Sequence, residues 1–201
     1  MYDFSYKNAS SVDDAINTHK SSEDGAFLAG GQTLLPTLKQ RLAQPSDLID
    51  LSGIGTLSNI EVGQVVKVGA MTTHAEVATS KEIQKALPAL SDLAEGIGDP
   101  QVRNRGTIGG SVANNDPAAD YPAVCLALNA TITTNKREIT ADDFFTGMFD
   151  TALDEGELIT SISFPIPEKA AYMKFPNPAS RYALVGVFVA KMNSGVRVAV
   201  T

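Results

Sequence analysis

Two glycine pairs constrain this chain more than any other feature of its sequence. Gly30-Gly31 follows the apolar run Ala26–Ala29 and precedes a helix-forming stretch that begins at Leu34, and Gly109-Gly110 recurs in the second half of the chain. A strand–glycine–helix junction presents backbone N–H groups to an anion, and glycine lets a pyrophosphate approach the backbone closely. Two such loops favour a dinucleotide held between two structural units.

Neither glycine pair matches the commonest nucleotide-binding motifs. The GxGxxG fingerprint and the GxxxxGK[ST] phosphate loop are both absent at these positions, which excludes an ordinary Rossmann or NTPase interpretation. Each pair alone is weak support, because a Gly-Gly dipeptide often forms only a turn. The polar residues Asn114-Asn115-Asp116 and Asp120 follow the second pair and strengthen the interpretation as a ligand site.

Helix-period and strand-period segments alternate along the chain, which favours an α+β or α/β architecture. In the first unit, residues 1–55, the strands are expected at Tyr2–Tyr6, Ala26–Ala29 and Asp47–Leu51. Helices from Ser10 or Ser11 and from Leu34 to about Leu42 would connect them by parallel crossovers.

A second α+β unit, residues 56–167, is expected after this one. It would contain a hairpin over 60–68, helices over 75–78, 83–97 and 118–128, and strands over 130–134 and 158–164. Three further strands, 172–175, 185–191 and 196–200, would begin a third unit that spans residues 168–201. Because nothing follows to cover the strand Val196–Val200, we expect a truncated domain and a longer native chain.

Composition narrows the function classes. Sixteen Lys and Arg residues stand against 23 Asp and Glu residues, giving a net charge of −7, and no basic stripe that could track nucleic-acid phosphates is present. A single cysteine, Cys125, excludes a disulfide within the chain and, with only His19 and His74 besides, no metal site is expected. The N-terminus does not resemble a signal peptide and no transmembrane segment is apparent, so we expect a cytoplasmic protein.

The remaining candidates fit structural roles. His19 fits a helix face, His74 fits a helix start, and Cys125 fits a small apolar residue inside a helix. Arg103 and Arg105 flank the second glycine pair and fit a phosphate contact and a surface ion pair equally well.

Two long segments resemble the flavin-binding segments of the FAD subunit of the molybdenum hydroxylases. They are AFLAGGQTLLPTLKQRLAQPSDLIDL and GDPQVRNRGTIGGSVANNDPAADYPA, and the later stretch ELITSISFPIP to AAYMKFPNPASRYALVGV is similar too. This family includes the medium chain of aerobic carbon monoxide dehydrogenase and the FAD domain of xanthine dehydrogenase. The resemblance implies a two-unit FAD-binding fold of the PCMH (vanillyl-alcohol-oxidase-like) type, followed by the truncated C-terminal α+β domain.

The resemblance also implies which residues bind FAD. The first pyrophosphate loop would comprise Phe27, Leu28, Ala29, Gly30, Gly31, Gln32, Thr33 and Leu34, and the second Thr107, Gly109, Gly110 and Ser111, with Asn114 following. Asp120 would accept hydrogen bonds from cofactor hydroxyls, Ile97 and Ile159 would lie beside the cofactor, and Lys174 near the flavin ring would raise its potential. Relatives usually carry Asp or Asn at the position of Ser111, and several carry His at that of Gln32.

The implied function is electron transfer. A molybdopterin centre on a large subunit would oxidise the substrate, and iron–sulfur clusters on a small two-iron two-sulfur subunit would pass electrons to this FAD and on to an external acceptor, in a dimer of heterotrimers. No residue of this chain need be catalytic. Carbon monoxide, a purine, an aldehyde and another heterocycle are all compatible with the sequence. The alternatives are a free-standing FAD-dependent oxidoreductase of the same fold and a flavin-free scaffold subunit.

Overall fold

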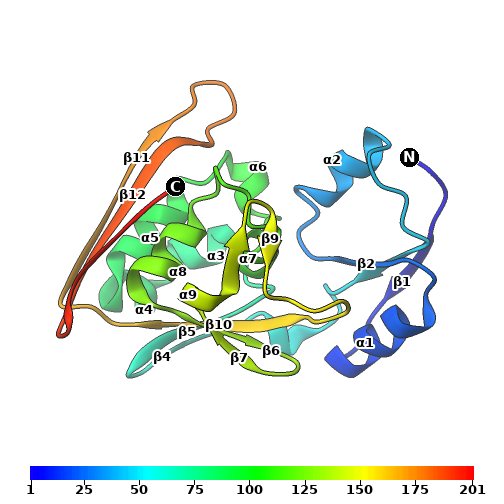
Figure 1. Cartoon of the computed structure of the whole chain (residues 1–201), viewed down its shortest axis with the longest axis horizontal. Coiled ribbons are helices and arrows are strands. Elements are labelled where there is room, and N and C mark those ends of the chain that lie inside the picture. Colours follow the sequence, from blue (N-terminus) through cyan, green and yellow to red (C-terminus); the bar gives the residue numbers. More distant parts are fainter.

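The computed structural model describes all 201 residues, from Met1 to Thr201, and contains three larger β-sheets arranged in a row (Figure 1). The N-terminal sheet lies at one end, a five-stranded sheet lies in the middle, and the C-terminal sheet lies at the other end. None of the helices has the length and apolar character that crossing a lipid bilayer requires. The mixture of helices and sheets is the α+β architecture expected from the sequence.

The N-terminal sheet is parallel, with strand order β1-β3-β2. The Ser11 hydroxyl caps the first helix by accepting a hydrogen bond from the Asp14 N–H at 3.1 Å. The strand expected from Tyr2 begins at Ser5, because Ser5 is the first of its residues to pair with the neighbouring strand, at Asp47. The second helix ends earlier than expected, since Arg41 adopts a φ of 59°. The elements are β1 (Ser5–Asn8), α1 (Val12–Ser21), β2 (Gly25–Leu28), α2 (Leu34–Lys39) and β3 (Asp47–Asp50).

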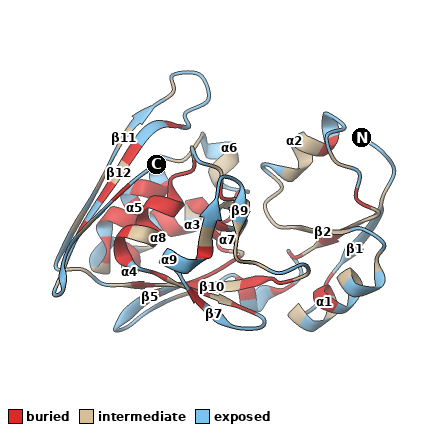
Figure 2. Cartoon of the chain, in the orientation of Figure 1, coloured by how far each residue is buried: buried red, intermediate tan, exposed pale blue.

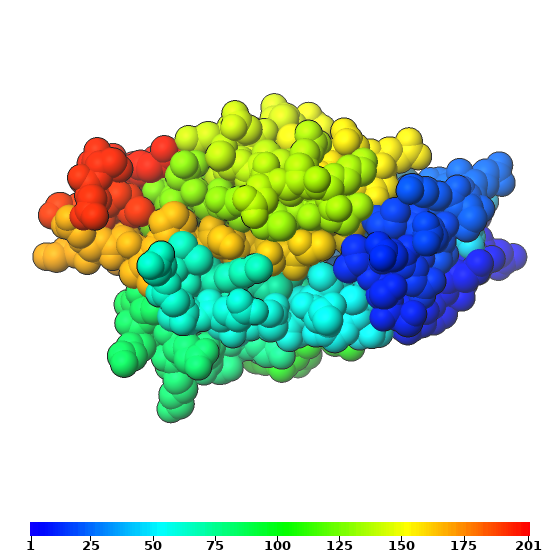
Figure 3. Space-filling model, turned by 90° about the horizontal axis from the view of Figure 1, so that it is seen from below, coloured from blue at the N-terminus to red at the C-terminus, as the bar shows by residue number.

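The middle sheet is antiparallel and has the strand order β4-β5-β10-β6-β7. In Figure 3, the orange segment around β10 runs between the cyan of β4 and β5 and the yellow-green of β6 and β7. The chain therefore returns from far along its sequence to complete this sheet. Its strands are β4 (Ile60–Val62), β5 (Val65–Gly69), β6 (Thr131–Thr134), β7 (Glu138–Thr140) and β10 (Ile159–Pro165).

Seven helices accompany the middle sheet. The single helix expected over 83–97 is two helices, because Pro88 lacks an N–H and Leu87 leaves the helical conformation. The helix expected over 118–128 starts only at Tyr121, and the glycine-rich stretch contains a helix of its own, α7. The helices are α3 (His74–Thr79), α4 (Lys81–Ala86), α5 (Pro88–Glu95), α6 (Pro100–Arg103), α7 (Ile108–Asn114), α8 (Tyr121–Leu128) and α9 (Ala141–Phe144); a short 3-10 helix, η1 (Gly55–Leu57), precedes β4.

The main core lies between the middle sheet, α5 and α8, where most buried residues gather (Figure 2). Tyr121, Phe144, Phe164 and Phe188 are its largest fully buried side chains. Phe188 belongs to the C-terminal sheet, which packs one face against this core and exposes the other. That antiparallel sheet consists of β11 (Lys169–Pro176), β12 (Ala183–Met192) and β13 (Gly195–Val200).

A smaller core belongs to the N-terminal sheet and η1 and includes Leu158, which comes from the segment before β10. The preceding segment also carries the hairpin of β8 (Phe145–Gly147) and β9 (Asp150–Thr151). Leu158 therefore ties the N-terminal sheet to the middle sheet, and a cavity lies between these two parts.

Candidate cofactor-binding site

A cavity of about 710 Å³ lies between the N-terminal sheet and the helices of the middle unit. This volume falls within the range of small-molecule and cofactor pockets. The structure brings fifteen of the expected site residues together on its wall: Phe27, Ala29, Gly30, Gly31, Gln32, Thr33, Leu34, Ile97, Thr107, Gly109, Gly110, Ser111, Asn114, Asp120 and Ile159. Leu28 and Lys174 are not on the wall.

The first glycine loop presents free hydrogen-bond donors. The backbone N–H groups of Gly30, Gly31, Gln32 and Thr33 donate to no acceptor within the protein. Gly31 has a φ of 72°, a left-handed conformation that favours glycine. Successive N–H groups in such a turn form a concave anion-binding nest. The loop therefore fits a pyrophosphate.

The second glycine loop differs from the first, although the sequence indicated the same chemistry for both. The N–H groups of Ile108 and Gly109 donate to the carbonyls of Thr72 (3.0 Å) and Ala70 (2.9 Å). Those of Gly110 and Ser111 donate to the side chain and the carbonyl of Thr107. Most N–H groups of this loop therefore hold α7 in place. At the cavity, the small residues of the loop form a wall that a ligand can approach closely.

Two glycines are required by protein packing rather than by a ligand. A Cβ at Gly30 would lie 2.1 Å from the carbonyl oxygen of Arg105, and a Cβ at Gly109 would lie 2.5 Å from the Cβ of Ala70. The first contact holds the first loop against the segment before Thr107, and the second holds α7 against the residue that follows β5. The glycines let the two loops meet at one edge of the cavity.

Asp120 connects the cavity to the C-terminal sheet. Its carboxylate accepts hydrogen bonds from the Tyr172 hydroxyl and from the Lys174 ammonium, the latter at 3.0 Å. Lys174 also donates to the Gly96 carbonyl oxygen at 3.0 Å. Burial raises the pKa of Asp120, and the bonds to Tyr172 and Lys174 partly oppose this rise. Lys174 does not line the cavity itself and contacts its wall through the Asp120 carboxylate.

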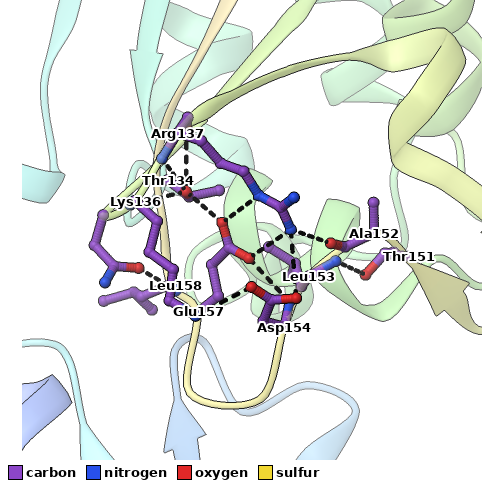
Figure 4. Close-up of polar contacts among 10 residues, drawn as sticks. Thr134, Lys136, Arg137, Thr151, Ala152, Leu153, Asp154, Glu157 and Leu158 are labelled. Carbon is purple, nitrogen blue, oxygen red and sulfur yellow. Dashed lines mark hydrogen bonds and ion pairs between the residues drawn. The ribbon is translucent and has the colours of Figure 1, made fainter.

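A charged cluster fixes the segment that leads into β10 (Figure 4). The Glu157 carboxylate is fully buried and accepts hydrogen bonds from the Thr134 hydroxyl (2.6 Å), from Arg137 (3.0 and 3.1 Å) and from the Asp154 N–H (2.9 Å). Burial raises the pKa of Glu157, but these bonds outweigh it and lower the pKa to about 2. Glu157 and its neighbour Leu158 line the cavity, so the cluster sets the position of this wall.

Sequence reasoning missed several lining residues, among them His74, Glu157, Arg181 and Tyr182. Arg181 and Tyr182 come from the turn between β11 and β12, where Arg181 has a φ of 63°. In the sequence, Glu157 lies among acidic residues that are typical of a solvated turn. Only its ion pair with Arg137 distinguishes it from them, and that pair is visible only in the structure. Arg103, for which a phosphate contact and a surface ion pair were both open, pairs with Glu95 at 3.8 Å and donates to the carbonyls of Ile97 (3.1 Å) and Gly98 (3.2 Å), so it braces the loop.

Comparison with known proteins agrees with this geometry. A sequence profile described as "FAD binding domain in molybdopterin dehydrogenase" matches residues 2–167. The nicotine 6-hydroxylase medium subunit of Paenarthrobacter nicotinovorans is 39% identical over 199 residues, covering 96% of this chain and 70% of that one. The carbon monoxide dehydrogenase medium chain of Hydrogenophaga pseudoflava is 38% identical over 212 residues, covering 98% and 74%.

Solved structures show the same fold. A carbon monoxide dehydrogenase structure from Hydrogenophaga pseudoflava, which lacks the Mo-pyranopterin moiety, superposes with a TM-score of 0.93 at 38% identity, over 100% of this chain and 75% of that chain. Quinoline 2-oxidoreductase from Pseudomonas putida 86 superposes with a TM-score of 0.92 at 32% identity, over 99% and 74%. The expected two-unit flavin-binding architecture is confirmed.

The fold and the two-loop cavity define a flavin-binding protein. The chain belongs to the family of FAD-binding domains of molybdopterin dehydrogenases, and its class is that of the FAD subunits of molybdenum hydroxylases. The resemblance found in the glycine-loop segments is thereby confirmed, as is FAD as the cofactor of this class. The two relatives named above are medium subunits of oxidoreductases that contain several subunits.

Proposed function

We propose that this chain transfers electrons, through bound FAD, from the iron–sulfur clusters of a partner subunit to an external acceptor. FAD supplies this chemistry when bound, because its flavin accepts and releases electrons. The observation that carries the proposal is the row of free N–H groups from Gly30 to Thr33 on the wall of a cavity of cofactor size. Four unpaired donors in sequence fit the oxygens of a pyrophosphate.

The roles of the chain's own residues follow from their positions. Gly30, Gly31, Gln32 and Thr33 would bind the pyrophosphate, while Thr107 and Gly110 would close the opposite side. Asp120 would accept hydrogen bonds from cofactor hydroxyls and is held for this by Tyr172 and Lys174. Phe27, Ala29, Leu34, Ile97, Gly109, Ser111, Asn114 and Ile159 complete the proposed site on the wall, and Leu28 belongs to the same proposed loop without lining the cavity.

The proposed partners are a molybdopterin-binding large subunit and a two-iron two-sulfur small subunit, in a dimer of heterotrimers in the cytoplasm. The medium-subunit relatives support the presence of partner subunits. Within the chain, we propose domain limits at 1–55, 56–167 and 168–201, and the division into three sheets supports them.

The test is an absorption spectrum of the chain after expression with its partner genes and mild purification. A flavin spectrum, released by acid as FAD, together with iron and molybdenum in the same complex, is the expected result. FAD without these metals would favour a free-standing oxidoreductase. A colourless protein that takes up no added FAD would favour a scaffold and would overturn the proposal.

A further inference from the structure

His74 lies where the two glycine loops meet. It is the first residue of α3, its exposed fraction is 5%, and it lines the cavity. Its N–H donates to the carbonyl of Gly106 at 3.0 Å. Its ring packs on the same glycine, since a Cβ at Gly106 would lie 2.6 Å from Nε2. Gly106 in turn adjoins Gly30, because a Cβ added at Gly30 would lie 2.7 Å from the α-carbon of Gly106.

The hydrogen-bonding capacity of this imidazole is unused within the protein. Nδ1 is fully buried and has no partner. Nε2 also has no hydrogen-bond partner within the protein. Unlike Nδ1, it is not enclosed, so it is accessible from the cavity that His74 lines. Buried polar atoms are nearly always paired, and the exceptions need an explanation.

The protonation state of the ring follows from its surroundings. Burial lowers the pKa of His74 to about 4, with a further contribution from the positive charge of Arg103. A neutral imidazole carries one proton, which leaves one nitrogen as donor and the other as acceptor. Because a proton on Nδ1 would be an enclosed donor without an acceptor, the form with the proton on Nε2 is favoured.

We propose that His74, with its proton on Nε2, donates a hydrogen bond to a phosphate oxygen of bound FAD at the junction of the two loops. This rests on the proposed binding of the pyrophosphate by Gly30–Thr33. A neutral donor suits the position, because it contributes a hydrogen bond to an anionic oxygen without a buried charge of its own. His74 is thus a cofactor-binding residue and not only the first residue of a helix.

The experiment compares FAD affinity in three variants of the full chain, measured by titration of the apoprotein with FAD and followed by flavin fluorescence. His74→Leu removes the donor and is expected to raise the dissociation constant about 10- to 100-fold, the effect of losing a hydrogen bond to a charged group. His74→Gln can place an amide N–H near the position of Nε2 and is expected to recover most of the affinity.

Tyr121→Phe is the control, because the Tyr121 ring centroid lies 5.4 Å from that of His74 and Tyr121 does not line the cavity. Its affinity should equal that of the parent chain.

A second measurement does not depend on any variant folding. The chain has two histidines, so nitrogen-15 spectra of the imidazoles contain only two spin systems. The proton of His74 is expected on Nε2, and the Nε2 shift should move when FAD is added. An Nδ1-protonated ring, an unmoved shift in a chain that binds FAD, or a folded His74→Leu variant with parental affinity would each overturn the proposal. Failure of the parent chain to bind FAD would instead overturn the proposed function.

Discussion

The α-carbon of Gly30 faces the carbonyl oxygen of Arg105 so closely that a side chain at position 30 would lie 2.1 Å from that oxygen. Gly30 belongs to the N-terminal unit and Arg105 to the middle unit. The contact therefore joins two parts of the chain at the edge of the cavity. It is made by backbone atoms, so side-chain rotation cannot relieve a larger residue there.

Gly30→Ala should separate the two loops. We expect a loss of about 3 kcal/mol in the free energy of unfolding, at the upper end of overpacking effects, together with loss of FAD binding. Urea denaturation and flavin content after purification would measure both. Gly55→Ala is the matched control, because a Cβ at Gly55 would have no atom within 4 Å, and its stability should change by less than about 0.5 kcal/mol. Equal stability of the two variants would contradict the expectation.

Glu157→Gln should weaken the cluster with Arg137 and Thr134. The neutral amide keeps the shape of the side chain but loses the charge that strengthens its hydrogen bonds, so the free energy of unfolding should fall by about 2 kcal/mol. Chemical denaturation at neutral pH measures the change. Glu155→Gln, at an exposed position of the same segment, is the control and should be nearly neutral.

The same carboxylate predicts a pH dependence. The pKa of Glu157 is lowered in the folded chain from its ordinary 4.5 to about 2, so the unfolded chain binds this proton first as the pH falls. The stability that Glu157 contributes is therefore complete above about pH 4.5 and is lost as the pH falls through about 2. The stability difference between the parent chain and Glu157→Gln should shrink over this interval. A difference that stays constant from about pH 6 to about pH 2 would rule out the mechanism.

Asp120→Ala should loosen β11 from the segment that carries Asp120. The substitution leaves the Lys174 ammonium, whose side chain is 9% exposed, without its carboxylate. Because an unpaired buried charge is costly, the loss should reach about 3 kcal/mol. Hydrogen exchange should also quicken in β11 more than in β5. Tyr172→Phe, which removes one hydrogen bond but leaves the ion pair, should cost about 1 kcal/mol.

Cys125 should be inert in the folded protein. It lies inside α8 with no exposed surface, and burial raises the pKa of its thiol, which suppresses the reactive thiolate. Iodoacetamide at about pH 8 should leave the native chain unmodified over an hour, as measured by mass spectrometry. The same reagent should label the chain fully in denaturant. Rapid labelling under native conditions would show that α8 opens.

Local patterns determined much of this fold in advance. The alternation of helix-period and strand-period segments predicted the parallel N-terminal sheet, and the hairpin predicted over 60–68 is that of β4 and β5. The glycine-loop segments also identified the family. Element boundaries differ from the prediction: Pro88 divides the helix predicted over 83–97, and the strand expected from Tyr2 begins at Ser5, where β3 offers a partner. A strand's ends depend on pairing, which a single segment does not encode.

By itself, the sequence revealed two glycine loops and favoured a dinucleotide held between two structural units. Only the tertiary structure decided how the two loops differ. The N–H groups of Gly30–Thr33 are left free, while those of Ile108–Ser111 are used within the protein. It also decided that His74 lines the cavity and that the cluster around the buried Glu157 fixes the segment at its wall. Hydrogen-bond partners lie far apart along the chain, so which donors remain for a ligand is settled only when distant segments pack together.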